Sequence, residues 1–119
     1  MAFEGILYLH IHSSDLARTK HFYGELLGWR LDTDLPDVAG LWFGAGYLVA
    51  GREQRPENAR IYNGGMHAAV RVDDLDAEHA MLSARGIAVS AIQSRPWGQR
   101  DFFFADPDGY RWEYVQPGA

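Results

Sequence analysis

The chain of 119 residues contains no cysteine, which excludes disulfide bonds, thiolate metal ligands and thiol nucleophiles together. It also lacks any run of about 18 apolar residues that could span a membrane. Its first residues, MAFEGILYLHIHSSD, lack the basic start and the small-residue cleavage site of a signal peptide. We therefore expect a cytoplasmic protein that has no membrane partner.

Positive charge is also scarce, because 11 Lys and Arg residues stand against 16 Asp and Glu, for a formal net charge of -5. A nucleic-acid-binding surface needs a concentrated positive field, so no nucleic-acid partner is expected.

No Ser-His-Asp order, phosphate-cradling Gly loop or His-Glu-x-x-His motif is present. The length and the 47% hydrophobic content predict one domain over residues 1–119 with a core of its own.

An internal repeat is the main feature that the sequence does contain. The segment YLHIHSSDLARTKHFYGELLGWRL, from Tyr8, and the segment HAAVRVDDLDAEHAMLSARGIAV, from His67, follow the same plan at an offset of 59 residues. Each has a short apolar or alternating run, then an Asp-Leu pair, then an amphipathic stretch that ends at a glycine. This order predicts a strand followed by a helix in each half.

The predicted helices have recognisable ends. Ser14 or Asp15 can accept hydrogen bonds from the first backbone N–H groups of the first helix, and Asp73 or Asp74 can do so for the second. Glycines close both stretches, as suits the left-handed residue after a helix. Each predicted helix has one apolar face that can pack against the core. Its residues are Leu16, Tyr23, Leu26 and Leu27, with Phe22 beside them, in the first helix, and Leu75, Met81 and Leu82 in the second.

Three further strand-like runs follow each helix. They are GWRLDTD, GLWFG and YLVAGRE in the first half, and IAVSAI, RDFFFAD and YRWEYVQP in the second. The Asp108-Gly109 pair predicts a hairpin turn between the last two. The sequence thus predicts an α+β fold of two βαβββ modules, residues 5–52 and 65–117, joined by a polar linker over residues 53–64.

The motifs SSDLARTKHFYGELLGW, HAAVRVDDL and DFFFADPDGYRWEYV, in this duplicated order, resemble the vicinal-oxygen-chelate superfamily. That superfamily includes glyoxalases, extradiol dioxygenases and bleomycin-resistance proteins, and the stretch RPWGQRDFFFADPDG is most similar to bleomycin-resistance members. The resemblance implies a curved eight-stranded mixed sheet around a cavity, formed within one chain or across a dimer. Because such modules leave sheet edges that need covering, we expect a homodimer.

Metal-dependent members of the superfamily ligate a divalent ion through four positions, which the resemblance places here at Tyr8, Ala50, His67 and Glu113. His67 and Glu113 can ligate a divalent metal, whereas Ala50 cannot and a tyrosine ligates only at the cost of ionising its phenol. Two alternatives stay open at this point. His67 and Glu113 hold a metal with help from Tyr8 or His10, or they form a charge-assisted hydrogen bond and contact a ligand directly.

Alternation along the first strand places Tyr8, His10 and His12 on one face and Leu7, Leu9 and Ile11 on the other, which is expected to cover the helix. These three side chains either line a ligand pocket or make ordinary hydrogen bonds within a wall. In the second half, His67, Arg71, Arg111 and Glu113 are expected on the face that points inward.

Aromatic residues in the predicted sheets suggest a planar or aromatic ligand, since stacked rings add about 1 kcal/mol beyond simple burial. We expect Trp42, Trp97 and Phe103 to provide this stacking, and Trp97 is the strongest candidate because it lies in the loop RPWGQR. The alternative is that most of these rings belong to the core. Arg52, Arg95 and Arg100 either serve as surface charge or meet an anionic ligand.

Together these features favour a small-molecule binding protein of the bleomycin-resistance type, which sequesters its ligand without a cofactor. The expected ligand-binding residues are Tyr8, His10, His12, Trp42, His67, Arg71, Trp97, Phe103 and Glu113. The second hypothesis is a divalent-metal-dependent lyase, isomerase or dioxygenase that uses His67 and Glu113. A third is an interaction module whose interior is filled by its own side chains.

Overall fold

The structure is a computed structural model that describes residues 2–52 and 66–118, and the chain divides into two compact units, residues 1–62 and 63–119. Each unit contains one of the two predicted βαβββ repeats. The predicted linker, residues 53–64, lies outside the described residues. Each unit is therefore described by itself.

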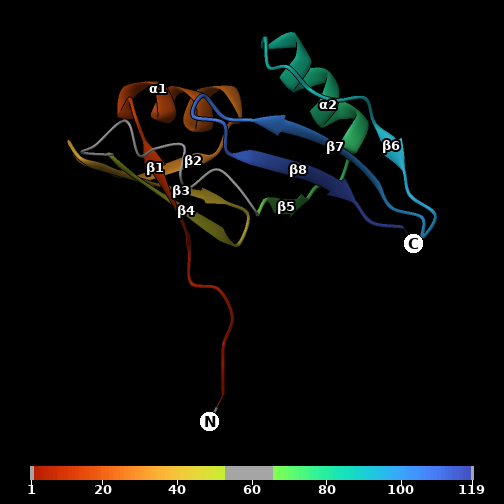
Figure 1. Ribbon diagram of the computed structural model, residues 1–119, viewed down its shortest axis with the longest axis horizontal. Coiled ribbons are helices and arrows are strands. Elements are labelled where there is room, and N and C mark those ends of the chain that lie inside the picture. Colours follow the sequence, from red (N-terminus) through yellow and green to blue (C-terminus); the bar gives the residue numbers. More distant parts are fainter. Residues whose placement is uncertain (1, 53–65, 119) are drawn as a thin grey trace. The chain divides into compact units, whose positions relative to one another are not determined.

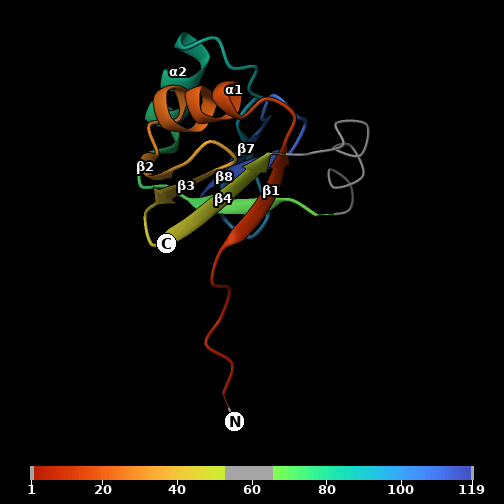
Figure 2. The same ribbon diagram turned by 90° about the vertical axis from the view of Figure 1, so that its left-hand side faces the viewer.

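The first unit is a four-stranded mixed sheet with one helical layer (Figure 1). Its elements are β1 (Leu9–Ser13), α1 (Leu16–Lys20), η1 (His21–Leu26), β2 (Arg30–Asp34), β3 (Val38–Phe43) and β4 (Gly46–Arg52). The strand order is β1-β4-β3-β2, in which β1 runs parallel to β4 and the other pairs are antiparallel. Figure 2 shows β1 and β4 side by side beneath α1.

The first helix begins where the sequence predicts and then changes its winding. The carboxylate of Asp15 accepts a hydrogen bond from the Arg18 backbone N–H at 3.2 Å, which caps α1. From His21 onward the turns widen into the π-helix η1, whose end is marked by a bond from the Leu27 N–H to the Phe22 carbonyl, five residues earlier. Gly28 then adopts a φ of 78°, the left-handed conformation that a closing glycine allows.

The second unit repeats this plan. Its elements are β5 (Ala68–Arg71), α2 (Leu75–Ala84), β6 (Gln93–Ser94), β7 (Arg100–Ala105) and β8 (Arg111–Gln116). The strand order β5-β8-β7-β6 matches that of the first unit, with β5 parallel to β8. The Asp74 carboxylate accepts from the Ala77 N–H at 3.0 Å and caps α2, while Gly86 closes it with a φ of 86°.

One predicted strand is wrong. The run IAVSAI, residues 87–92, has no strand in the structure, and the edge strand β6 covers only Gln93–Ser94. Ser90 explains the difference, because its backbone N–H donates to the Phe103 carbonyl at 2.9 Å while its hydroxyl accepts from the Phe103 N–H at 2.8 Å. A side chain thus takes the place of one rung of the ladder, and regular pairing begins only at Gln93.

The core of each unit lies between its sheet and its helix. Tyr23, Leu41 and Leu48 are fully buried in the first unit, and Leu75, Leu82 and Phe102 are fully buried in the second. Leu26 and Met81, which the sequence also predicts in these layers, are only half-buried. No helix of the described chain is long and apolar enough to cross a membrane.

The predicted α+β fold of two βαβββ modules is confirmed, and the eight strands within residues 2–52 and 66–118 form two hydrogen-bonded sheets of four. The expected closure of these sheets around a cavity stays a prediction.

Candidate functional site

The second sheet has one face that packs against α2 and one face that carries polar side chains. Phe102 faces the helix, because its ring contacts His79 of α2 edge-on at 4.9 Å between centroids. Phe103 therefore points the other way, and it lies directly opposite Glu113 in the antiparallel ladder. We call this second side the polar face. Its residues are His67, Arg71, Arg95, Gln99, Asp101, Phe103, Arg111 and Glu113.

A histidine and a carboxylate meet at the centre of the polar face. The Nε2 atom of His67 lies 3.0 Å from Oε1 of Glu113, and the Glu113 side chain is only 11% exposed. His67 immediately precedes β5, and β5 pairs with β8 so that Ala69 is in register with Glu113. The charge-assisted hydrogen bond that the sequence offers as the alternative to metal ligation is therefore present.

Gln99 links this pair to a second carboxylate. Its Nε2 atom donates to Oδ2 of Asp101 at 2.9 Å and to Oε2 of Glu113 at 3.4 Å. Only the NH₂ end of the amide can donate to carboxylates, so these two contacts fix the orientation of the side chain. The amide oxygen Oε1 is then directed to Trp97, whose indole N–H donates to it at 3.2 Å.

Asp101 is fully buried and held by an arginine fork. Nε and one terminal nitrogen of Arg95 each donate to a different oxygen of its carboxylate, both at 2.8 Å. Such a bidentate pair favours the ionised carboxylate. The Arg95 hydrogen bonds, opposed by burial and assisted by Gln99, lower the pKa of Asp101 to about 2. Asp101 is thus a fixed negative charge across the range in which proteins function.

Trp97 is a large apolar side chain presented to solvent. It is 69% exposed, although its loop is closed by hydrogen bonds from the Arg95 N–H to the Gln99 carbonyl at 2.7 Å and from the Gly98 N–H to the Arg95 carbonyl at 2.9 Å. Gly98 has a φ of 92°, which this tight turn requires. The indole is thus held at one end while its ring stays accessible.

Phe103 provides an aromatic surface next to the carboxylates. Its ring meets the His67 ring edge-on, with the centroids 5.3 Å apart. The guanidinium carbon of Arg111 lies 5.0 Å from the centroid of the same ring, within the range of a cation–π contact. Arg71 lies on the same side of the sheet, since it pairs with Val115 two residues beyond Glu113.

The face of the first sheet away from α1 and η1 carries the predicted histidine row. The rings of His10 and His12 are stacked, 5.0 Å apart and 16° from parallel, and Tyr8 lies 6.5 Å from His10. The predicted row of these three rings is confirmed, but β1 begins at Leu9, and Leu7, which the sequence predicts to cover the helix with Leu9 and Ile11, is 84% exposed. Gly51 makes room for the row, because a Cβ there would come within 2.8 Å of His10 Nε2. Partial burial, and then the charge of His12, lower the pKa of His10 from its ordinary value of 6.5.

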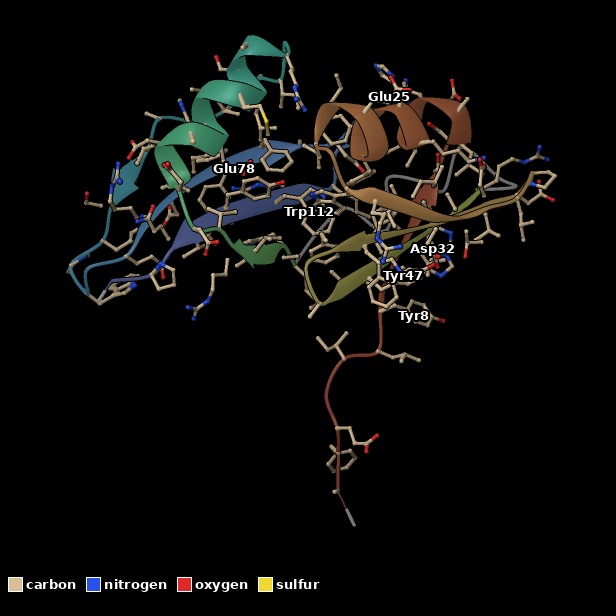
Figure 3. The ribbon with its side chains drawn as sticks, turned by 180° about the vertical axis from the view of Figure 1, so that it is seen from behind. Tyr8, Glu25, Asp32, Tyr47, Glu78 and Trp112 are labelled. Atoms are coloured by element: carbon tan, nitrogen blue, oxygen red, sulfur yellow. The ribbon has the colours of Figure 1, made fainter. Side chains whose placement is uncertain are left out.

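Trp42 and Tyr47 extend this face along β3 and β4, where they pair directly and their rings lie 4.5 Å apart. The Tyr47 hydroxyl crosses the backbone of Gly40 to reach Asp32 Oδ2 and Thr33 Oγ1, each at 3.1 Å. Figure 3 shows Tyr8, Asp32 and Tyr47 on the side of the first sheet opposite the helix that carries Glu25. Tyr47 is a residue of this face that the predicted site does not contain.

One predicted equivalence is wrong. The sequence matches Ala50 with Glu113, but the ladder registers pair His10 with Val49 in the first unit and Ala69 with Glu113 in the second. His10 and Ala69 correspond at the offset of 59 residues, so their strand partners Val49 and Glu113 are counterparts. Ala50 is fully buried and pairs with Ile11, on the helix side of β4. Aligning the two Gly-Tyr pairs shifts the register by one residue, because Gly109-Tyr110 lies in the turn before β8 rather than in the strand.

The corrected register leaves the family's metal positions with an unsuitable set of donors. His67 and Glu113 have side chains that can ligate a metal. The other two positions hold Tyr8, a tyrosine, and Val49, whose hydrocarbon side chain has no donor atom. Across residues 2–52 and 66–118, no group of three or more His, Asp or Glu side chains gathers in a way that could hold a metal ion. These residues do not fit a four-ligand divalent site.

The three arginines considered for an anionic ligand all have carboxylate partners. Arg95 binds Asp101, Arg100 binds both oxygens of Asp76 at 2.9 and 3.0 Å, and Arg52 lies 3.6 Å from Asp37. Gln99 and Asp101 are missing from the predicted site. Alternation in RDFFFAD would have placed Asp101 on the same side as Phe103, whereas nothing in the sequence singles out Gln99.

Two mixed sheets with the order 1-4-3-2, each carrying its helices on one face, define the class of protein to which this chain belongs. It is a member of the Glyoxalase/Bleomycin resistance protein/Dioxygenase superfamily, whose family model matches residues 5–114.

Three similar proteins illustrate the range of this class. The antibiotic-binding protein TnmS3 from Streptomyces sp. CB03234 is 30% identical, with a TM-score of 0.81 and 99% of each chain covered. A glyoxalase family protein from Enterococcus faecalis is 28% identical, with a TM-score of 0.79, and the match covers 98% of this chain and all of that one. Uncharacterized protein YaeR from Escherichia coli (strain K12) is 29% identical, covering 92% of this chain and 93% of its own.

Proposed function

We propose that this protein binds a planar aromatic small molecule on the polar face of the second sheet and on the adjoining loop that carries Trp97, and releases it chemically unchanged. Trp97 and Phe103 supply the rings against which the ligand stacks, and His67 and Glu113 supply hydrogen bonds at its edge. The resemblance to TnmS3 supports this assignment, because that protein is an antibiotic-binding member of the same superfamily.

The exposure of Trp97 is the observation that carries the proposal. The Trp97 ring is 69% exposed, so a ligand can cover it without displacing other side chains. The Gln99 hydrogen bond already restricts the orientation of the ring. Binding to a side chain that is already ordered costs less conformational entropy than binding to a freely rotating one. The tethered indole therefore favours a flat partner that stacks on it.

The arrangement of the polar side chains supports ligand binding rather than catalysis of a reaction. Both Glu113 oxygens have partners, Oε1 in His67 and Oε2 in Gln99, and Asp101 is neutralised by Arg95. Groups fixed in this way orient a ligand through hydrogen bonds at its edge. We propose Tyr8, His10, His12 and Trp42 as ligand contacts on the first sheet considered by itself, on the evidence of their shared face and of the stacked rings of His10 and His12.

Matched probes test the proposal. Equilibrium dialysis would compare 2-naphthoate with the saturated analogue trans-decalin-2-carboxylate, which has similar size and charge but no flat ring system. We expect 2-naphthoate to bind more tightly, the Trp97→Ala variant to lose about tenfold in affinity, and Leu35→Ala, which removes another exposed apolar side chain, to lose none. Equal affinity for both probes, or loss of the bound compound to a reaction product by mass spectrometry, would contradict the proposal.

Metal analysis separates binding from the metalloenzyme hypothesis. Protein purified without chelator and its His67→Ala variant would be compared by elemental analysis. The donor set predicts no stoichiometric divalent metal in either preparation. A stoichiometric metal that disappears in His67→Ala would instead support a metal-dependent enzyme.

We also propose a homodimer, supported by the apolar side chains of Phe3, Ile6 and Leu7, each more than 80% exposed. A cytoplasmic location stays a prediction, and cell fractionation tests it.

A further inference from the structure

Five of the arginines in the described residues differ in their partners, and the difference bears on the charge of the ligand. Arg52, Arg95 and Arg100 each lie against a carboxylate. Arg71 and Arg111, both on the polar face, have no carboxylate partner among residues 2–52 and 66–118. These two cations are therefore available to a molecule that binds there.

The carboxylates of the same face are outnumbered, because Asp101 and Glu113 are its two acidic side chains among the described residues and Arg71, Arg95 and Arg111 are its arginines. Both Asp101 oxygens accept from Arg95, and one also accepts from Gln99. The Glu113 oxygens are used by His67 and Gln99. The polar face therefore keeps an excess of positive charge although the whole chain has a net charge of -5. An anion gains from this local field, whereas a second cation would be repelled.

Arg111 is placed to read an anion attached to a flat ring. Its guanidinium lies over Phe103 at 5.0 Å, a contact that restricts the side chain while leaving its N–H groups free to donate. A planar guanidinium binds a carboxylate through two parallel hydrogen bonds, which an ammonium cannot match. Phe103 and Arg111 thus present an aromatic ring and a guanidinium group in contact with each other.

We propose that the ligand is a planar aromatic anion, an aromatic carboxylate or an ionised phenol, and that Arg111 is the residue that selects for its charge. This inference rests on the proposed binding function and adds to it the chemical class of the ligand. The anion pairs with the Arg111 guanidinium, and the ring system lies against the aromatic side chains of the polar face.

The experiment compares 2-naphthoate with 2-naphthamide, a neutral probe of the same shape, by isothermal titration near neutral pH. We expect the wild-type protein to prefer 2-naphthoate by about tenfold, since a charged hydrogen bond contributes about 1.5 kcal/mol or more. Arg111→Gln should abolish this preference, Arg111→Lys should restore part of it, and added salt should weaken it. Arg100→Gln, which removes the same charge from a residue paired with α2, should keep the preference.

Each other outcome overturns a distinct statement. If 2-naphthamide binds as tightly as 2-naphthoate, the anionic class is wrong while the binding function stands. If Arg111→Gln folds normally and keeps the preference, Arg111 is not the selecting residue. If neither probe binds at any accessible concentration, the proposed function itself fails.

Discussion

At the scale of single residues, Gln99 links the two carboxylates of the polar face to the exposed tryptophan. Its amide joins the two carboxylates on one side and the Trp97 indole on the other. Its neighbours thus decide which end of the amide faces the tryptophan. An acceptor fixed in this way orders an exposed ring that would otherwise sample several rotamers.

Replacement of Gln99 tests this connection. In a Gln99→Met variant the Trp97 indole N–H loses its acceptor, so its NMR resonance should move upfield and exchange faster with water. The indole resonances of Trp29 and Trp112, both buried, should stay in place. Gln93→Met, on the adjacent strand β6, is the matched control and should leave the Trp97 signal unchanged. An unaltered Trp97 resonance in Gln99→Met would show that the amide does not hold the ring.

Asp101 gives a pH-dependent prediction. Its pKa falls from 3.8 to about 2 on folding, so the stability that it contributes is complete above the unfolded value and is lost as the pH drops toward 2. Asp101→Asn should lower the free energy of unfolding by about 1–3 kcal/mol near neutral pH, because charged hydrogen bonds to Arg95 are lost.

Urea denaturation at several pH values checks this expectation. The difference between the wild type and Asp101→Asn should shrink between pH 3.8 and pH 2, as the wild-type carboxyl takes up its proton. Asp37→Asn, which breaks only an exposed 3.6 Å ion pair, should cost much less. A difference that is constant over this range would contradict the assigned pKa.

The sequence predicts single residues well where strand alternation governs them. The row of Tyr8, His10 and His12 follows from a period of two, and so does the grouping of Arg71 with Glu113. Gln99 could not be predicted in this way, because it lies in a loop whose conformation depends on the Arg95–Gln99 backbone bond and on Gly98. Loop contacts of this kind have no periodic signature.

At the scale of elements, both helix caps follow from the sequence, and the Asp74 cap can be tested directly. Asp74→Ala removes the acceptor for the Ala77 N–H and should destabilise the protein by about 1 kcal/mol in chemical denaturation. Asp74→Ser, which keeps a capping oxygen, should retain most of the stability. Equal losses in both variants would show that the cap contributes little to α2.

Register is the element-scale property that the sequence does not determine. Counting from the two Gly-Tyr pairs gives Ala50 as the counterpart of Glu113, whereas the ladder gives Val49. A shift of one residue moves a side chain to the opposite face of a strand, so the wrong choice turns a helix-side alanine into a supposed site residue. The π-helix η1 is similarly absent from the pattern, because its widened turns depend on bonds such as Leu27 to Phe22.

At the scale of the whole molecule, the repeat explains why the fold is predictable. Two copies of one pattern, 59 residues apart, support each other, and both give the strand order 1-4-3-2. Among the strands of the described residues, the edge strand of the second unit is shorter than expected, because the Ser90 side chain interrupts the pairing.

The N-terminal residues provide a molecule-scale prediction. Figure 1 shows residues 2–8 extending away from the strands of the first unit, and Phe3, Ile6 and Leu7 are exposed along them. Burying each such side chain against a second copy would contribute about 1.5–3 kcal/mol. Sedimentation velocity should therefore show a dimer, and the triple change of these residues to Ser should shift it to monomer, whereas Leu35→Ser should not. A wild-type monomer at high concentration would contradict the prediction.

The most direct test of the account is to locate a planar aromatic ligand on the protein by NMR. Titration of ¹⁵N-labelled protein with 2-naphthoate should shift the Trp97 indole and the amides of Gln99, Phe103, Arg111 and Glu113, while amides along the outer surface of α2 stay in place. Saturable shifts confined to those groups of the polar face and the Trp97 loop are the predicted result. Shifts that gather on α2, or none at saturating ligand, would contradict it.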